Sequence, residues 1–562
     1  MKRRDFLLST AALGSLALAD TSPAAEPAAA PLATGTGPLV KGGVYQAGSL
    51  AQLFVDQMVV RQADNIAFTL HPARKHPANP LVRADQPWEG WRLRYGSVIH
   101  DDQERQFKMW YTGDSESDVP GDAALYATSA DGIHWTKPLV GTIAFGSFAA
   151  GTEAAIAAAA AGKPPTDKST AAKIATGQHN AVAAGAGEPN VIKDVDDHDP
   201  ARRYKMIAFV WDGHAYALGN PNHGYHTFVS PDGLNWTRHS KKAIAPGEDI
   251  ITAYYDRLRR LWVALVKFTG NPVAKGRRFF WRVTSSDFDN WSEPQLAFHG
   301  DLRDDAGALA RIERARPLLD VPDAPDLIHT EFYGAGFYRA ESCLLAFPSV
   351  FTINNAGRHG GQEGPSELQL AISRDLDAWE RPFRLPSVEP GTPDQWDCGF
   401  LISQGQALRV GDEIRLYYSG SNVTHGTPCL YLPGDPARKT KYTGSIGLAI
   451  WPLDRFVSAD GSTEGGRLTT VPLAFSGNRL ELNANCDRRG RAGSVRVELL
   501  DAAQKPLPGI GLSDEVKTDS LRHTVTWAGN SDVSAWQVRP VSLRFHLAGA
   551  ELYSFAFREA KA

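Results

Sequence analysis

Short runs of alternating apolar and polar residues recur along most of the chain, and four of them lead into the same seven-residue turn. The turn has Ser, Asp and Trp at its first, third and seventh places, and its copies are residues 129–135, 230–236, 285–291 and 373–379. Alternation predicts strands, because successive side chains of a strand point to opposite faces. An Asp at the third place can accept hydrogen bonds from backbone amides two residues on. Each copy therefore predicts a strand, a tight turn and a Trp packed beneath it.

Another strand precedes each copy of the turn, and a fifth unit follows that lacks the Trp turn. The upstream strands are residues 105–113, 202–213, 260–268 and 341–350, and the fifth unit comprises 412–422 and 444–456. A repeated unit of about four strands is typical of a β-propeller. We predict an all-β fold with a five-bladed β-propeller over residues 45–460. The alternative, unrelated hairpins in a β-sandwich, gives no reason for the turn to recur.

The sequence pattern changes after the fifth unit. Residues 465–558 continue as alternating strands without the Asp and Trp turn, which predicts a C-terminal β-sandwich. An Ala-rich stretch at about 145–178 interrupts the repeats and is expected to be a peripheral insertion.

The first 30 residues are not expected to belong to the fold. Lys2, Arg3 and Arg4 precede a short apolar run, as in a twin-arginine export signal, with an ordinary secretory signal or an uncleaved anchor as alternatives. We therefore expect a periplasmic or secreted protein with no stable membrane insertion after the signal is cleaved. The four cysteines form no CxxC pair, so we expect free buried thiols and no zinc site.

Composition narrows the class of ligand. The net charge of -4 provides no basic field for a nucleic acid. The 14 Trp and 16 Tyr suggest stacking surfaces for sugars in addition to packing. We expect no required cofactor, and no ligand motif supports a structural calcium ion. The oligomeric state is not readable from the sequence.

Acidic residues stand at the start of several blades, where the inner strand lines the channel of a propeller. They are Asp249 of blade three, Glu331 of blade four and Asp397 of blade five. Carboxylates that share one pocket push their pKa values apart, and glycosidic cleavage uses one neutral acid and one ionised base. The alternative is that they bind sugar hydroxyls or pair with arginines.

Aromatic faces and forked hydrogen-bond donors, which commonly grip sugars, accompany these acids. The candidate substrate-binding residues are Asp56, Trp88, Glu89, Arg92, Arg94, Tyr95, His179, Asn180, Arg277, Trp396 and His425. For each of them a purely structural role is the alternative.

The repeats and segments such as FVDQMVV, RKHPANP, FKMWYTG, WDCGF and residues 444–470 resemble the five-bladed glycoside hydrolases. That group contains invertases, fructanases, arabinanases, xylosidases and mannoside phosphorylases, and the similarity is closest to exported bacterial proteins described as invertase-like. It covers residues 50 to 556. The Asn-Asp-Pro-Asn-Gly, Arg-Asp-Pro and Glu-Cys motifs of true invertases are absent, so the resemblance does not imply sucrose or fructan activity.

The resemblance implies a carboxylate site in an exported enzyme that hydrolyses an oligo- or polysaccharide, with a furanosidic linkage expected by analogy. Glu331 is then expected to be the proton donor, and Asp249 or Asp397 the base, with Asp56 and Glu89 in reserve. A non-catalytic sugar-binding propeller, a polysaccharide lyase and a glycoside phosphorylase remain as alternatives on the same fold.

Overall fold

The computed structural model describes residues 40–560 apart from 42, 87, 91, 114–122, 144–177, 211–222, 248, 269–276, 320, 357–361, 404, 427–442, 489–490 and 538. The predicted signal segment and nearly all of the Ala-rich insertion lie outside these residues. The side chain of Tyr95 lies outside them too.

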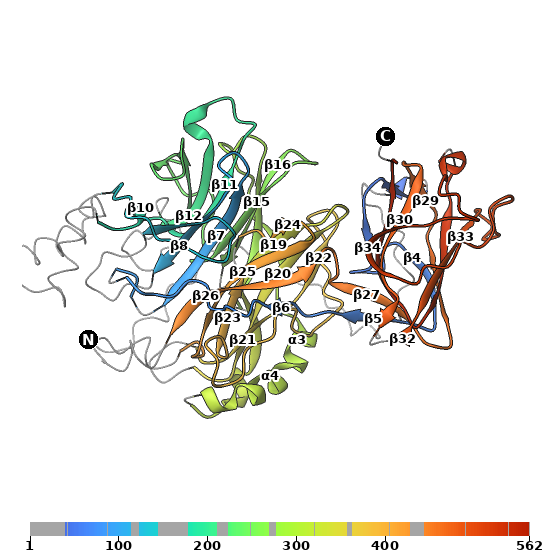
Figure 1. Ribbon diagram of the computed structural model, residues 1–562. Coiled ribbons are helices and arrows are strands. Elements are labelled where there is room, and N and C mark those ends of the chain that lie inside the picture. Colours follow the sequence, from blue (N-terminus) through green and yellow to red (C-terminus); the bar gives the residue numbers. More distant parts are fainter. Residues whose placement is uncertain are drawn as a thin grey trace, which may run out of the picture.

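Five small antiparallel sheets form the larger part of the molecule (Figure 1). The strands of blades one to three are β7 Leu93–Asp101, β8 Gln106–Gly113, β9 Ala124–Ser129, β10 Ala181–Ala183, β11 Gly187–Lys193, β12 Tyr204–Val210, β13 Gly224–Ser230, β14 Thr237–Arg238, β15 Ile251–Asp256, β16 Leu261–Phe268, β17 Phe279–Ser285 and β18 Gln295–Phe298. Those of blades four and five are β19 His329–Arg339, β20 Leu344–Ile353, β21 Ser366–Leu368, β22 Ala371–Ser373, β23 Phe400–Ser403, β24 Leu408–Val410, β25 Glu413–Ser421, β26 Gly444–Pro452 and β6 Arg74–Lys75.

The sheets close into a ring through their inner strands. β7 contacts β11, β11 contacts β15, β15 contacts β19, β19 contacts β23, and β25 and β26 return to β7. The fold is thus a β-propeller, as the repeats predict. The inner strands run in the same direction around the ring, so their first residues lie at one end of the channel.

The recurring turn has the predicted hydrogen bonds. In the second copy, Asp232 accepts the backbone N–H groups of Leu234 and Asn235, each at 2.8 Å. The indole N–H of Trp236 donates to the carbonyl of Gly233 at 2.9 Å. The residue after the Asp has a left-handed backbone in all four copies, with φ of 75°, 79°, 69° and 78° at Gly132, Gly233, Phe288 and Leu376.

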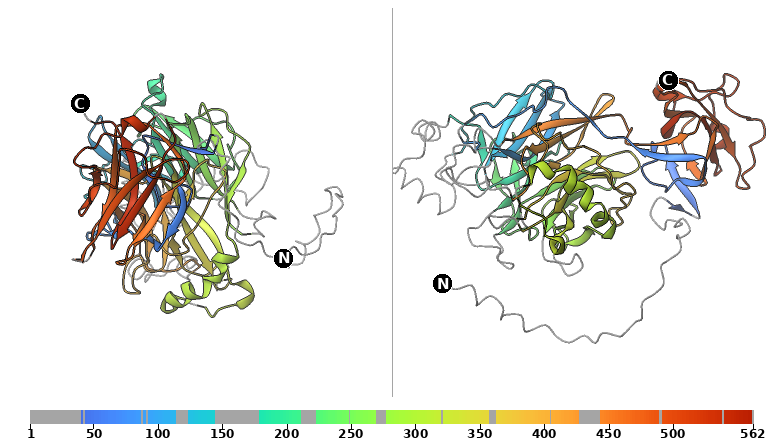
Figure 2. Two further views of the ribbon diagram at one scale, coloured as in Figure 1. Left: turned by 90° about the vertical axis from the view of Figure 1, so that its right-hand side faces the viewer. Right: turned by 90° about the horizontal axis from the view of Figure 1, so that it is seen from below.

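The second body is a β-sandwich at one side of the ring (Figure 2). Its strands are β1 Val40–Lys41, β2 Val44–Gly48, β3 Gln52–Leu53, β4 Val60–Asp64, β5 Ile66–Leu70, β27 Val457–Gly461, β28 Gly466–Thr470, β29 Leu473–Phe475, β30 Arg479–Asn485, β31 Asp487–Arg488, β32 Arg491–Ala492, β33 Ser494–Leu500, β34 Asp519–Thr524, β35 Ser542–Ala548 and β36 Glu551–Arg558. Leu480, Leu482, Val497, Phe545 and Phe555 are among the buried residues of its core.

The boundary between the two bodies differs from the expected residues 45–460. β2, β3, β4 and β5 pair with strands of the sandwich, and only β6 joins the propeller, where it pairs with β26 of blade five. β27 also belongs to the sandwich, although its first residues were expected in the propeller. Alternation identifies a strand but not its partner, so the sequence assigned these strands to the body next to them in the chain.

Helices are few. They are α3 Leu302–Ala306, α4 Ala308–Arg314 and the 3-10 turns η2 Pro200–Arg202, η3 Arg316–Leu318, η4 Pro325–Leu327 and η6 Ser534–Trp536. The helices α3 and α4 pack against β19 and β20 of blade four. Within the described parts of the chain, no helix has the length and apolar character needed to span a membrane.

Candidate active site

The inner strands of three blades are irregular near the channel end at which they begin. The pairing register shifts between Arg94 and Gly96 in β7, between Gly187 and Asn190 in β11, and between Phe332 and Ala335 in β19. Such bulges turn side chains out of the regular alternation and are common beside active sites. Glu188 of blade two and Tyr333 of blade four lie inside two of these irregularities.

Two acidic residues at this end have strained backbones. Glu188 has a φ of 56° and Asp249 a φ of 49°, both in the left-handed region that residues other than Gly rarely adopt. Tyr225 packs so closely on Gly247 that a side chain there would meet its ring at 2.0 Å, which fixes the loop before Asp249. Strain of this kind persists where surrounding structure holds it, and it clusters at functional sites.

Asp249 is held by three donors. Lys267 of β16 places its ammonium 2.5 Å from Oδ1, the backbone N–H of Ile250 donates to the same oxygen at 2.6 Å, and the Tyr333 hydroxyl donates to Oδ2 at 3.2 Å. Burial is the largest influence and raises the pKa of this carboxyl group, but the charge and hydrogen bond of Lys267, the N–H of Ile250 and the charge of Arg94 together outweigh it, so the pKa of Asp249 is lowered. Its side chain is 29 % exposed, so this ionised carboxylate can be reached from solvent.

Glu331 lies between two cations. Arg278 contacts Oε2 at 2.5 Å and His329 contacts Oε1 at 2.9 Å. Burial raises the pKa of Glu331, but the hydrogen bond from His329 and the charge of Arg278 outweigh burial, and the net pKa is lowered. Glu331 is therefore ionised at neutral pH. This contradicts the expectation of a neutral proton donor and agrees with the alternative that these acids pair with arginines.

His329 faces an acceptor with each ring nitrogen. Nδ1 is 2.6 Å from the carbonyl of Leu327, and Nε2 is 2.9 Å from Glu331. The hydrogen bond to Glu331 raises the pKa of His329 despite opposing burial. An imidazole with two acceptors can donate to both only in its doubly protonated form. His329 therefore carries a proton that it can donate at the channel mouth.

Tyr333 connects the two carboxylates. Its hydroxyl contacts Asp249, while the Arg278 guanidinium that binds Glu331 lies 5.3 Å from the centre of its ring. Lys267 lies 4.0 Å from the same centre. His425 packs at 5.4 Å from the ring, and burial lowers its pKa to about 3, so it is neutral.

Blades one and two add a further pair. Arg94 lies 4.0 Å from Glu188. The charge of Arg94 helps to lower the pKa of Asp249, and the charge of Arg92 helps to lower that of His425, so both arginines act electrostatically on the cluster. Of the predicted residues, the structure thus brings together Asp249, Glu331, Arg92, Arg94 and His425.

Asp397 does not join this group. Its carboxylate is buried and pairs with Lys75 of β6 at 2.6 Å, and it accepts the Tyr418 hydroxyl at 2.7 Å. No contact among the described residues links it to Asp249 or Glu331. Lys75 belongs to the outermost strand of blade five, so Asp397 secures that strand. Trp396 beside it stacks on Tyr418 at 5.6 Å and has the same structural role.

Other predicted residues of blade one form a buried network of hydrogen bonds and ion pairs. Asn180 accepts the Trp88 indole N–H at 2.7 Å and donates to the Tyr111 hydroxyl at 2.7 Å. Glu89 accepts from that hydroxyl at 2.6 Å and pairs with Lys137 at 2.8 Å. Trp88, Glu89, Asn180 and His179 are all buried. Their burial and mutual contacts favour the alternative that they hold blade one together over a role in binding sugar.

Two other predicted residues have structural partners. Asp56 forms a two-point ion pair with Arg374 of the fourth turn, at 2.8 and 2.9 Å, where the propeller meets the sandwich. Arg277 binds both oxygens of Asp305, which anchors α3 to the residues just before β17.

The sequence analysis missed Glu188, Lys267 and Tyr333 as site residues. Glu188 could have been found, because it opens the inner strand of blade two as Asp249 opens that of blade three. Lys267 and Tyr333 stand in apolar strands and carry no local signal. Their position depends on which blades become neighbours.

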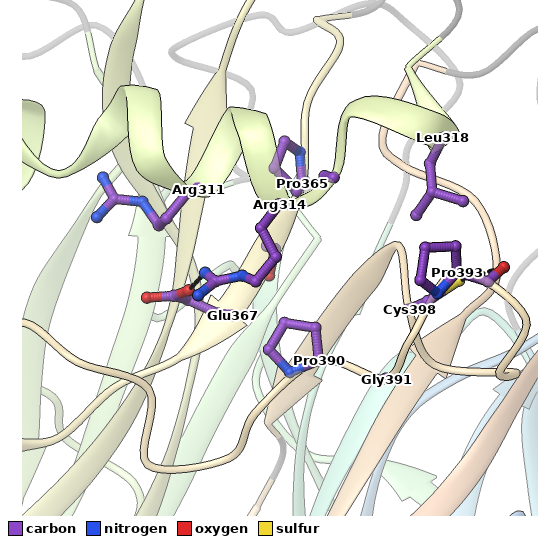
Figure 3. Close-up of a pocket in the computed structure, with 11 residues that line it drawn as sticks. Arg311, Arg314, Leu318, Pro365, Glu367, Pro390, Gly391, Pro393 and Cys398 are labelled. Atoms are coloured by element: carbon purple, nitrogen blue, oxygen red, sulfur yellow. Dashed lines mark hydrogen bonds and ion pairs between the residues drawn. The ribbon is translucent and has the colours of Figure 1, made fainter.

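A separate pocket lies between α4 and the loop that connects β22 to β23 (Figure 3). Pro365, Pro390 and Pro393 form much of its wall, and Glu367, the acid among its lining residues, pairs with Arg314. It offers no second carboxylate and does not include the cluster at the channel end.

Donor atoms of His71, Asp460 and Glu551 in the sandwich lie within 4.8 Å of one another, as a metal site requires. Hydrogen bonds hold the carboxylates: Thr69 donates to Asp460 at 2.8 Å and Tyr553 to Glu551 at 2.7 Å. These contacts account for the group as part of the packing between β5, β27 and β36.

No protein-family model matches the chain, and no curated protein matches it. It is similar in structure to an N-acetylgalactosamine deacetylase from F. plautii, with a TM-score of 0.39, 14 % identity and coverage of 71 % of this chain and 96 % of the other. A glycosyl hydrolase from Bacteroides ovatus gives 0.38 and 11 %, over 68 % and 94 % of the two chains.

A β-1,2-mannobiose phosphorylase from Listeria innocua gives a TM-score of 0.38 and 12 % identity, over 68 % of this chain and 97 % of the other. The solved structures similar to the chain thus include a glycoside hydrolase and a phosphorylase. All three TM-scores lie below 0.5, so the case for a function rests on the site itself.

Proposed function

We propose that the protein is an exported glycoside hydrolase that cleaves an oligo- or polysaccharide at the channel end of the propeller. One observation carries the proposal: an accessible, ionised Asp249 from blade three contacts Tyr333 from blade four, beside the His329 and Glu331 pair. Glycosidic cleavage needs a base or nucleophile and a separate proton donor. Both are available there from different blades.

Asp249 is assigned as the carboxylate that acts on the anomeric side of the bond, because Lys267 keeps it ionised. His329 is assigned as the proton donor, with Glu331 holding its ring. A histidine whose pKa is raised from its usual range can give up a proton near neutral pH, as a general acid must. Glu331 acts through His329 in this assignment.

The test is turnover on a panel of plant and bacterial polysaccharides and aryl glycosides, with and without inorganic phosphate. The wild type should release reducing sugar without phosphate, and Asp249→Asn and His329→Gln should each lower kcat by about 100-fold or more, the usual contribution of one acid or base. Asp289→Asn is the control, because Asp289 is a half-exposed acid that pairs with Arg202 outside the site.

Three results would contradict the proposal. Full activity in Asp249→Asn would show that the reaction does not need the Asp249 carboxylate. Turnover that depends on phosphate would make the protein a phosphorylase. Sugar binding by calorimetry without turnover on any panel member would make it a binding protein.

An eliminating lyase is the second candidate. Tyr333 has Lys267 and Arg278 over its ring, and a tyrosine beside cations could remove a proton next to a uronate carboxylate. Elimination yields an unsaturated sugar that absorbs ultraviolet light, whereas hydrolysis does not. Absorbance of the products therefore separates the two reactions.

A further inference from the structure

The contact between Tyr333 and Asp249 has the layout of an activated nucleophile and its base. A hydroxyl within hydrogen-bond reach of a base, with a third group that orients the base, is the general signature of such a pair. The Tyr333 hydroxyl lies 3.2 Å from Oδ2 of Asp249. Lys267 and the N–H of Ile250 both occupy Oδ1, at 2.5 and 2.6 Å. Oδ2 is thereby directed at Tyr333.

Burial and the charge of Asp249 raise the pKa of the Tyr333 hydroxyl, and two nearby cations oppose this rise, so the phenol is protonated at rest. Lys267 and Arg278 lie 4.0 and 5.3 Å from the ring centre. A nearby cation stabilises an anionic form, and a phenol that loses its proton to Asp249 becomes anionic. Two cations thus lie over a ring whose hydroxyl contacts Asp249, although packing alone would require only an aromatic ring at this place.

The backbone is irregular at both groups. Tyr333 lies within the register shift between Phe332 and Ala335, and Asp249 has a left-handed φ of 49°. Gly334 next to Tyr333 has no room for a side chain, since a Cβ would lie 2.7 Å from Ile402. The irregular strand is therefore built into the packing between blades four and five.

We propose that Tyr333 is the nucleophile of the reaction and that Asp249 is its base. This inference rests on the proposed function. The Tyr333 oxygen bonds to the anomeric carbon while its proton passes to Oδ2 of Asp249. The bond from that carbon to the glycosidic oxygen breaks, and the departing oxygen keeps the electron pair and takes a proton from His329. Water then attacks the anomeric carbon, loses a proton to His329, and the released Tyr333 oxygen recovers its proton from Asp249.

A neutral hydroxyl nucleophile also indicates the class of substrate. A carboxylate nucleophile is repelled by a sugar that bears a negative charge at or beside its anomeric carbon, whereas a phenol is not. We therefore expect the favoured substrate of this site to be a glycoside of an acidic sugar.

The experiment follows the stereochemistry and the covalent intermediate of the reaction on the panel substrate that is cleaved fastest. Proton NMR of the first product should show retention of anomeric configuration, since two displacements occur. Acid quenching during turnover of its dinitrophenyl glycoside should trap one sugar, and fragment spectra should place it on Tyr333. Tyr333→Phe should lose at least about 1000-fold in kcat with little change in KM.

Tyr254→Phe is the matched control, because Tyr254 is a buried tyrosine of the neighbouring inner strand that packs on Phe337. It should keep wild-type kcat. Inversion of configuration, or a label on Asp249 or Glu331, would overturn the proposal and leave the hydrolase standing. If the substrate that is cleaved fastest carries no charge, the expectation of an acidic sugar is wrong. Absence of any turnover by the wild type would instead remove the proposed function itself.

Discussion

At the scale of single residues, Lys267 decides the chemical state of the site. It is 2 % exposed and has its ammonium 2.5 Å from Asp249, so it holds this carboxylate ionised in a place where burial alone would favour the neutral form. A buried charge is tolerated when a partner compensates it. Lys267 and Asp249 compensate each other.

Lys267→Met should move the acid limb of the pH profile of kcat/KM upward by at least about one unit, the usual influence of an opposite charge at this distance. Without Lys267 the pKa of Asp249 rises, so protonation inactivates the enzyme at a higher pH. Lys205→Met is the control, since Lys205 is equally buried and pairs with Asp194 and Asp197 far from the channel. An unmoved acid limb would show that Lys267 only packs.

At the scale of elements, the recurring turn stabilises each blade locally. In the third copy Asp287 accepts the N–H groups of Asp289 and Asn290, at 2.9 and 2.8 Å, and the side-chain amide of Asn290 at 2.9 Å. These donors lower the pKa of Asp287, because they bind its carboxylate form.

Asp287→Ala should lower the free energy of unfolding by about 1–2 kcal/mol, since two or three modest hydrogen bonds are lost. Asp377→Ala is the control in the fourth copy. Asp377 is 71 % exposed and contributes a surface ion pair to Arg282, so its loss should cost less than about 0.5 kcal/mol. Urea titration of both variants measures the difference. Equal values would mean that the Asp of the turn does not stabilise it.

At the scale of the whole molecule, buried charges occupy the junction of the two bodies. Arg374, in the fourth turn, binds Asp56 through two hydrogen bonds and also contacts the hydroxyl of Tyr45. Asp56→Asn leaves a buried arginine without its counter-charge, so it should cost about 3–5 kcal/mol. The double variant Asp56→Asn with Arg374→Met should regain part of this loss in thermal melts. A double variant that is less stable than Asp56→Asn would contradict the account.

The segment that connects the propeller to the sandwich contains an acidic side chain, Asp454, whose protonation depends on pH near 6. Burial raises the pKa of Asp454, between β26 and β27, to about 6. Its unfolded value is about 4, so the ionised form is disfavoured in the fold. The wild type therefore loses stability as pH rises from about 4 through 6, by about 3 kcal/mol for a shift of two units.

Asp454→Asn removes this dependence. Its Tm should exceed that of the wild type at pH 8 and match it at pH 4, because the wild-type carboxyl is then neutral as well. Asn accepts the left-handed φ of 58° at this position. Asp412→Asn, at an exposed ion pair with Arg522, is the control and should show no such crossover. Parallel Tm curves for the wild type and Asp454→Asn would refute the assignment.

A site residue could be predicted where its role depends on the local sequence, and could not where its role depends on a contact with a distant residue. Asp249 and Glu331 stand at the start of inner strands, and the repeat alone placed them at the channel. Asp397 stands at a similar place before β23, yet Lys75 from a strand more than 300 residues earlier captures it. Trp88 and Glu89 have the composition of a sugar site, but Asn180, Tyr111 and Lys137 satisfy them internally.

The amino-acid sequence by itself determined the blades, because alternation and the Ser, Asp and Trp turn are local and each blade repeats them. It also determined which acids begin the inner strands. Only the tertiary structure decided which charges meet. Lys267, Arg278 and Tyr333 join Asp249 and Glu331 through contacts between blades, and strands β2 to β5 pair with the far end of the chain, because pairing and burial depend on neighbours in space.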